Sequence, residues 1–141
     1  MGRRWRWWVF ALVVVVVLLA GLTWGASQPW TANHFGYALA GQDGLPAYVF
    51  ISGRRYHSAQ VCAGAGWCKA DMARQNIPRC YTQADLSGRG AWPLETAGTM
   101  FTLFGAQRAL LVPTGSRGLT SPIIIADGLN CYVQYGLEGG P

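Results

Sequence analysis

The segment Trp7–Trp24, WWVFALVVVVVLLAGLTW, is a run of 18 residues without a charged side chain. As a helix it is about 27 Å long at 1.5 Å per residue, close to the ~30 Å hydrocarbon core of a bilayer. Five consecutive valines are poor helix formers in water, but in lipid every backbone polar group must be satisfied within the segment, which favours a helix. The sequence therefore predicts one transmembrane helix over residues 7–24.

The residues that flank this run predict its orientation in the cytoplasmic membrane. Indole rings and cations are favoured at headgroup depth, and short cytoplasmic segments carry an excess of Lys and Arg. The first basic residue after the run is Arg54, about 30 residues further on. The N-terminus is thus expected in the cytoplasm, with the rest of the chain outside. The residues assigned to anchoring are Arg3, Arg4, Arg6, Trp5, Trp7 and Trp8 on the inner side and Trp24 on the outer side.

A cleaved signal peptide, which would release a secreted domain, is the alternative reading of the same segment. The apolar run exceeds the usual 7–15 residues of such a peptide. Cleavage after Ala26 would also place Trp24 where a small residue is required. We therefore expect an uncleaved signal anchor.

Composition restricts the remaining residues to one small domain. The formal charge of the whole chain is +5, but residues 25–141 hold eight Lys and Arg against six Asp and Glu. This near balance argues against a nucleic-acid-binding surface, and an aromatic content of 13% argues against disorder. We divide the chain into a basic cytoplasmic tail (1–6), the helix (7–24), a stalk or irregular linker (25–46) and an extracytoplasmic domain (47–141).

Apolar and β-branched runs predict a β-rich α+β fold for this domain, with two hairpins and one short helix. The first hairpin pairs 47–51 with 54–58 around Ser52-Gly53. The second turns at Asp127-Gly128, and its last strand alternates so that residues 131, 133, 135 and 137 share a face. The helix is expected at 69–76, ended by Pro78. The other expected strands are 100–104, 109–112 and 122–126, and both a closed barrel and an open sheet accommodate them.

Four cysteines in a small extracytoplasmic domain predict two disulfides, for which three connectivities exist. We favour Cys62–Cys68, which closes the short loop CAGAGWC, together with Cys80–Cys131, which ties the region after the helix to the last strand. A metal site would have to use His57, Cys62 and Cys68 with Cys80. The five-residue gap between Cys62 and Cys68 is loose for zinc, and C-x-x-C is missing from the sequence.

Candidate catalytic residues do not assemble into a recognisable motif. His34 lies in the expected linker, and His57 precedes Ser58 on a strand, where neighbours point to opposite faces. The sequence contains neither a G-x-S-x-G elbow nor a phosphate-binding glycine loop, and no cofactor is expected.

The sequence therefore favours a single-pass membrane protein with a non-catalytic outer domain, either an accessory subunit or an envelope interaction module. Its partners would be the lipid bilayer and a larger membrane protein or an envelope polymer, but not nucleic acid. A membrane-tethered enzyme or a thiol-redox or metal-binding protein, using His57 and the cysteines, is the alternative.

Overall fold

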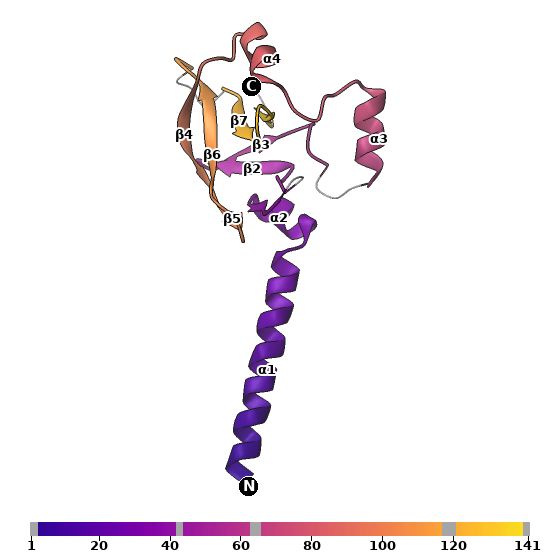
Figure 1. The fold of residues 1–141 in the computed structure, drawn as a ribbon, viewed down its shortest axis with the longest axis vertical. Coiled ribbons are helices and arrows are strands. Elements are labelled where there is room, and N and C mark those ends of the chain that lie inside the picture. The colour runs from indigo at the N-terminus through magenta and orange to yellow at the C-terminus, as the bar shows by residue number, and fades with distance from the viewer. Residues whose placement is uncertain (1–2, 42–43, 63–65, 117–120, 140–141) are drawn as a thin grey trace.

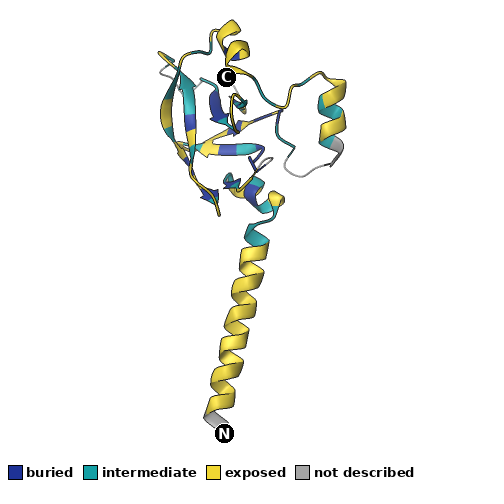
Figure 2. Cartoon of the chain, in the orientation of Figure 1, coloured by how far each residue is buried: buried dark blue, intermediate teal, exposed yellow. Residues whose placement is uncertain are grey.

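The computed structural model describes residues 3–41, 44–62, 66–116 and 121–139. A single helix, α1 (Arg3–Ala26), projects from a small β-rich domain and forms the lower half of the molecule in Figure 1. The helix packs against none of the described domain residues along most of its length, and Figure 2 shows it exposed almost from end to end. The prediction of one long apolar helix at this position is confirmed.

The β-rich domain is built on a curled, six-stranded antiparallel sheet with the order β2-β3-β8-β7-β6-β4. Strands β4, β6, β7 and β8 form a meander, and the hairpin β2–β3 adds to its β8 edge. A short parallel pair, β1–β5, lies apart from this sheet. The strands are β1 (Ala38–Leu39), β2 (Tyr48–Ile51), β3 (Arg54–His57), β4 (Leu94–Met100), β5 (Thr102–Leu103), β6 (Arg108–Pro113), β7 (Ile123–Ala126) and β8 (Tyr132–Leu137).

Both predicted hairpins are present. Ser52 and Gly53 take left-handed backbone conformations, as a two-residue hairpin turn requires, and β2 pairs with β3 in register from Tyr48↔His57 to Ile51↔Arg54. Strand β7 pairs with β8, and the inward positions Val133 and Tyr135 are buried. The alternation read from the sequence therefore places the last strand correctly.

The core lies inside the curl of the sheet. Tyr135 is fully buried there, and its hydroxyl donates a hydrogen bond of 2.7 Å to the carbonyl oxygen of Pro46. All three isoleucines of β7 are buried, as expected for a central strand covered on both faces. The core residues are Ala38, Leu45, Val49, Tyr56, Met100, Leu110, Ile123, Ile125, Val133 and Tyr135.

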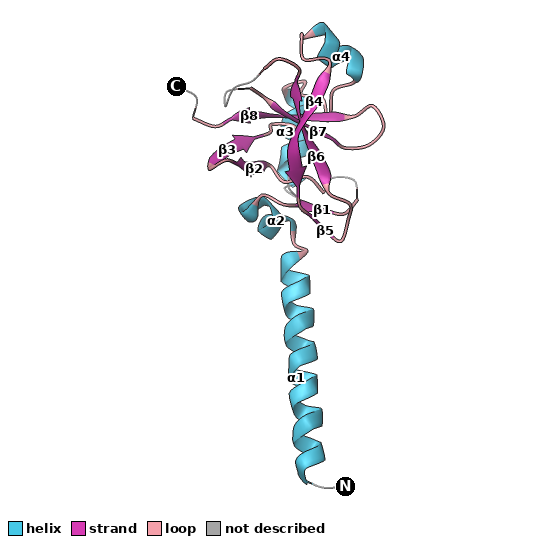
Figure 3. Ribbon diagram, turned by 90° about the vertical axis from the view of Figure 1, so that its left-hand side faces the viewer, coloured by secondary structure: helices cyan, strands magenta, loops and turns pink. Residues whose placement is uncertain are grey.

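Three short helices surround the sheet, whereas one was expected. The predicted helix at 69–76 corresponds to α3 (Gly66–Arg74), and α2 (Pro29–Phe35) and α4 (Gln83–Gly88) are additional. Figure 3 shows α2 at the end of the domain next to α1, and α4 at the opposite end.

Residues 25–46 differ from the stalk or irregular linker expected for them. They contain α2 and β1, and they contribute Ala38, Leu45 and Pro46 to buried positions. Helix α2 begins with Pro29 in its first turn and ends at Gly36, which takes a left-handed conformation and donates its N–H to Ala32. Local capping, rather than periodicity, therefore produces this helix, and the domain starts directly after α1.

Strand β4 also differs from expectation. The strand predicted at 100–104 contains β5 and the last residue of β4, with a break at Phe101, whereas the rest of β4 (Leu94–Met100) was not expected. The sequence LETAGTM lacks apolar alternation because β4 is an edge strand with half-exposed side chains and a register irregularity between Thr96 and Gly98. Pairing with β6, not local preference, forms it.

Candidate functional site

An open groove lies at the end of the domain opposite α1. Its walls are Gln83, Ala84 and Ser87 of α4, and Asn130 and Tyr132 of the β7–β8 turn and β8. The volume of the groove is about 490 Å³, which is in the range of small-molecule sites. Each of the five lining residues is uncharged, so the groove offers amides, hydroxyls and an aromatic ring to a ligand.

A capping box holds the first wall of the groove. The Thr82 hydroxyl accepts a hydrogen bond from the Asp85 N–H (3.2 Å), and the Asp85 carboxylate accepts one from the Thr82 N–H (2.8 Å). The backbone and side-chain hydrogen bonds from Thr82 lower the pKa of Asp85. Leu86, on the other face of α4, is fully buried and fixes the helix to the domain.

Three links join the two walls. The side-chain oxygen of Asn130 accepts a hydrogen bond of 2.8 Å from the N–H of Gln83, across the groove. Tyr81 and Tyr132 exchange two backbone hydrogen bonds of 2.8 and 2.9 Å. Cys80 and Cys131 lie next to this bridge with their sulfur atoms at disulfide distance, 2.25 Å. The groove is therefore preorganised rather than formed by loose loops.

Aromatic rings extend the surface beside the groove. Trp92 packs edge-on against Tyr132, with ring centroids 5.9 Å apart. The Arg89 guanidinium lies 4.1 Å from the centroid of the Tyr81 ring, in a cation–π contact. Flat rings next to amide and hydroxyl groups suit a neutral, polar ligand with an apolar face.

The cysteines pair as predicted. The sulfur atoms of Cys62 and Cys68 are 2.24 Å apart, and Cys80 pairs with Cys131. The ring of His57 packs on that of Tyr48 in the neighbouring strand, with centroids 5.0 Å apart. Among the described residues, no group of three His, Cys, Asp or Glu side chains lies close enough to hold a metal ion.

The two histidines do not form a catalytic pair with a hydroxyl. His57 is exposed, whereas the next residue, Ser58, is buried, and its hydroxyl accepts a hydrogen bond from the Gln60 N–H. His34 is exposed on α2, where its ring contacts Phe35 edge-on. The opposite orientation of His57 and Ser58 follows from strand geometry, as predicted.

The predicted anchoring residues lie on one continuous helix. Trp5, Trp7 and Trp8 are exposed in its first turns and Trp24 is exposed near its end. Arg3, Arg4 and Arg6 belong to the same helix, which begins at Arg3, so the expected tail is not separate from it. The stretch Trp5–Ala26 is long and apolar enough to cross a membrane.

Residues of the groove were not expected from the sequence. Gln83, Ser87 and Asn130 are ordinary polar residues of turns and short helices. The signal that could have located α4 is Thr82-x-x-Asp85, a spacing typical of a capping box. The contact between Gln83 and Asn130 joins residues 47 positions apart, and no local pattern reports it.

Comparisons with known proteins give no match: no family model, curated protein or solved structure is significantly similar to this chain.

Proposed function

We propose that this chain is a single-pass protein of the cytoplasmic membrane whose outer domain is a non-catalytic interaction module. In this proposal α1 spans the bilayer with its N-terminus inside, and the domain presents the groove between α4 and β8 to a partner outside. The observation that carries the proposal is α1 itself. Its 22-residue apolar stretch is exposed along most of its length and would not be tolerated as a free surface in water.

The charge distribution supports the orientation. Arg3, Arg4 and Arg6 precede the apolar stretch, and the 27 residues from 27 to 53 contain one acidic residue, Asp43, and no Lys or Arg. Basic residues close to a membrane helix favour the cytoplasmic side. Paired cysteines in the domain suit an oxidising compartment outside the membrane.

The chemistry of the groove supports binding rather than catalysis. Its lining residues supply no carboxylate, imidazole or thiol, and the Ser87 and Tyr132 hydroxyls would need an activating partner for nucleophilic or proton-transfer catalysis. An accessory subunit or a module that binds an envelope polymer would use such a surface, because shape, hydrogen bonds and aromatic contacts suffice for recognition.

The first experiment is an intact-mass measurement on protein extracted from native membranes, alkylated before and after reduction. We expect a mass close to the 15.3 kDa of the full chain and alkylation of four thiols only after reduction. A species lighter by about 3 kDa, as removal of an N-terminal signal would produce, would replace the anchor by a secreted domain. Alkylation before reduction would favour the thiol-redox or metal-binding alternative.

The groove is tested by site-specific photocrosslinking in cells. A photoreactive residue at Gln83, in the groove, is expected to give a discrete crosslinked species. The same residue at Ala73, exposed on α3, serves as the matched control and is expected to give none. Equal crosslinking at both positions, or none at Gln83, would contradict a role for the groove.

A further inference from the structure

Large apolar side chains gather at the end of the domain from which α1 emerges. Trp30 and Phe35 belong to α2, and Phe101 and Phe104 lie on either side of β5. Their exposed fractions are 69%, 67%, 59% and 69%. In Figures 1 and 3, α2 and β5 lie at the lower edge of the domain, and in Figure 3 they lie on either side of the point where α1 joins it. We call these four residues the helix-proximal aromatic set.

The segments that carry this set contain no charge. Residues 24–41 and 96–107 have no Asp, Glu, Lys or Arg, although the chain as a whole has 17 such residues, 11 basic and 6 acidic. A surface that faces water normally mixes charged groups with its apolar ones, so an uncharged aromatic surface is typical of an interaction site.

The connection between α1 and this surface is short and hydrogen-bonded. Only Ser27 and Gln28 separate α1 from α2. The Thr31 hydroxyl donates to the carbonyl oxygen of Gly25 (2.8 Å), and the Tyr37 hydroxyl donates to that of Ala26. The ring of Tyr37 also contacts Phe101, with centroids 6.2 Å apart. These contacts hold both α2 and the β5 region close to the last turn of α1.

The length of α1 determines where that turn lies relative to a bilayer. The 22-residue stretch Trp5–Ala26 is about 33 Å long at 1.5 Å per residue, slightly more than the hydrocarbon core. Its last turn therefore reaches the headgroup layer. The first residues after it, which include Trp30, lie in the zone where Trp and other aromatic side chains are most stable.

We infer that the helix-proximal aromatic set lies in the outer headgroup layer of the bilayer, so that the domain rests on the membrane instead of standing off on a stalk. This inference rests on the proposed membrane anchor. The occupant of the surface is lipid, because the surface continues directly from the apolar helix and the segments that carry it, 24–41 and 96–107, have no Asp, Glu, Lys or Arg for an ionic partner. For the same reason, zwitterionic lipid is sufficient and anionic lipid is not required.

The inference is tested with variants of the full chain that each carry one additional cysteine, while the four native cysteines stay paired. Each variant is labelled at the added cysteine with an environment-sensitive fluorophore and reconstituted in phosphatidylcholine vesicles. Phe35→Cys and Phe104→Cys place the label in the aromatic set. Val15→Cys places it in the middle of α1 and reports the anchor. Leu129→Cys, fully exposed in the β7–β8 turn beside the groove, is the matched control. Each label is challenged with spin-labelled lipid and with aqueous iodide.

Spin-labelled lipid is expected to quench the labels at Phe35 and Phe104 at least twofold more than the label at Leu129. The label at Leu129 should be quenched by iodide alone. If the labels at Phe35 and Phe104 behave like the label at Leu129 while the label at Val15 is quenched by spin-labelled lipid, the domain lies away from the membrane. The inference is then wrong, but the membrane anchor remains supported. If Val15 is not quenched by lipid, the anchor itself fails. Protection of Phe35 and Phe104 from both quenchers would identify a second copy of the chain as the occupant and overturn the inference.

Discussion

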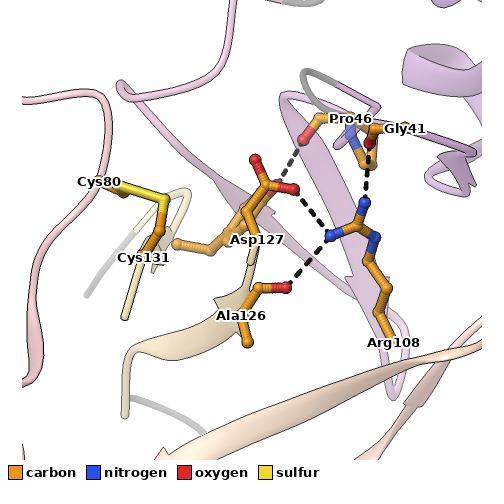
Figure 4. A network of polar contacts seen from close by, with 8 residues as sticks. Gly41, Pro46, Cys80, Arg108, Ala126, Asp127 and Cys131 are labelled. Atoms are coloured by element: carbon orange, nitrogen blue, oxygen red, sulfur yellow. Dashed lines mark hydrogen bonds and ion pairs between the residues drawn. A yellow bond between two sulfur atoms is a disulfide. The ribbon is translucent and has the colours of Figure 1, made fainter. Parts of the chain in front are cut away.

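Arg108 makes three hydrogen bonds that join separate parts of the domain. One guanidinium nitrogen donates to the Asp127 carboxylate (2.7 Å) and to the carbonyl oxygen of Ala126 (3.1 Å), and the other donates to that of Gly41 (3.1 Å). Figure 4 shows these acceptors converging on the guanidinium from three directions. The side chains of Arg108 and Asp127 are only 18% and 7% exposed, so this pair links β6, the β7–β8 turn and the segment after β1 in a largely dry setting.

We expect Arg108→Gln to lower the free energy of unfolding by about 3 kcal/mol, because it leaves the Asp127 carboxylate buried without a cation. Arg55→Gln is the matched control. Arg55 pairs with Glu138, but their side chains are 54% and 38% exposed, and such surface pairs contribute about 0–1 kcal/mol. Denaturant unfolding in detergent measures the free energy of unfolding of both variants. Equal losses for the two variants would contradict this account, as would a double variant Arg108→Gln/Asp127→Asn that is no more stable than Arg108→Gln.

The ionisation of Tyr135 makes the free energy of unfolding depend on pH in the alkaline range. Burial raises the pKa of its hydroxyl, the nearby Asp127 raises that pKa further, and Arg108 opposes both. The unfolded chain ionises this tyrosine near pH 10, whereas the folded domain keeps it protonated. The contribution of Tyr135 is therefore fully present below about pH 10 and is lost as pH rises through the folded pKa, at up to about 1.4 kcal/mol per pH unit.

Unfolding midpoints between pH 8 and 11.5 measure this effect. Tyr135→Phe is expected to be less stable at pH 8, because it loses the hydrogen bond to Pro46, and to show a weaker decline above pH 10. Tyr48→Phe, a half-buried tyrosine of β2, is the control and should retain the decline of the unaltered protein. A Tyr135→Phe profile parallel to the unaltered one would refute the assignment.

At the scale of elements, the two cysteine pairs have different roles. Cys80 and Cys131 are 51 residues apart and join the segment before α4 to the start of β8, next to the groove. Cys62 and Cys68 are six residues apart and close a loop at the start of α3, outside the sheet. One pair connects distant parts of the domain, and the other connects neighbours.

We expect Cys80→Ala/Cys131→Ala to lower the free energy of unfolding by about 4 kcal/mol and Cys62→Ala/Cys68→Ala to lower it by about 2 kcal/mol. The disulfide that closes the longer loop removes more entropy from the unfolded chain. Thermal unfolding of the two double variants, compared under oxidising conditions, measures the difference. Peptide mapping without reduction first verifies the pairing. A disulfide between Cys62 and either Cys80 or Cys131 would contradict the pairing. A larger loss of stability in the variant that lacks the short loop would contradict the entropic explanation.

At the scale of the whole molecule, the junction between α1 and the domain determines how the groove is presented. Two hydrogen bonds from Thr31 and Tyr37 to the last turn of α1 fix the angle between helix and domain. Burial raises the pKa of the Tyr37 hydroxyl, so it remains a donor across the neutral range. With α1 upright in a bilayer, the groove would face away from the lipid at a constant height.

We expect Thr31→Val/Tyr37→Phe to make the angle between α1 and the domain more variable without unfolding the domain, because neither residue belongs to the hydrophobic core. Spin labels at Leu22 of α1 and Ala73 of α3 measure it as a distance distribution. The unaltered chain should give one narrow peak, and the double variant a peak at least twice as wide. Tyr48→Phe serves as the control, and an unchanged width in the double variant would show that other contacts fix the angle.

The elements with a strong local pattern were predictable. An uninterrupted apolar run leaves a helix as the way to satisfy its backbone, and α1 follows. A two-residue turn between β-prone runs was sufficient for β2–β3, and alternation in the last strand was sufficient for β7–β8, where residues 127–131 form a longer turn than the expected Asp127-Gly128. Of the three possible pairings of the cysteines, the one favoured from the sequence, a short local loop together with a link to the last strand, is the one in the structure.

Tertiary structure alone decided the remaining features. Strand β4 is an edge strand formed by pairing with β6, and Ala38, Leu45 and Pro46 are buried although their segment lacks periodicity. Helices α2 and α4 are exceptions, because local caps define them. The groove depends on Gln83 meeting Asn130, and the aromatic set on α2 and β5 meeting beside α1. Local sequence encodes which face of an element is apolar, but contacts between distant residues arise only when the sheet curls and brings them together.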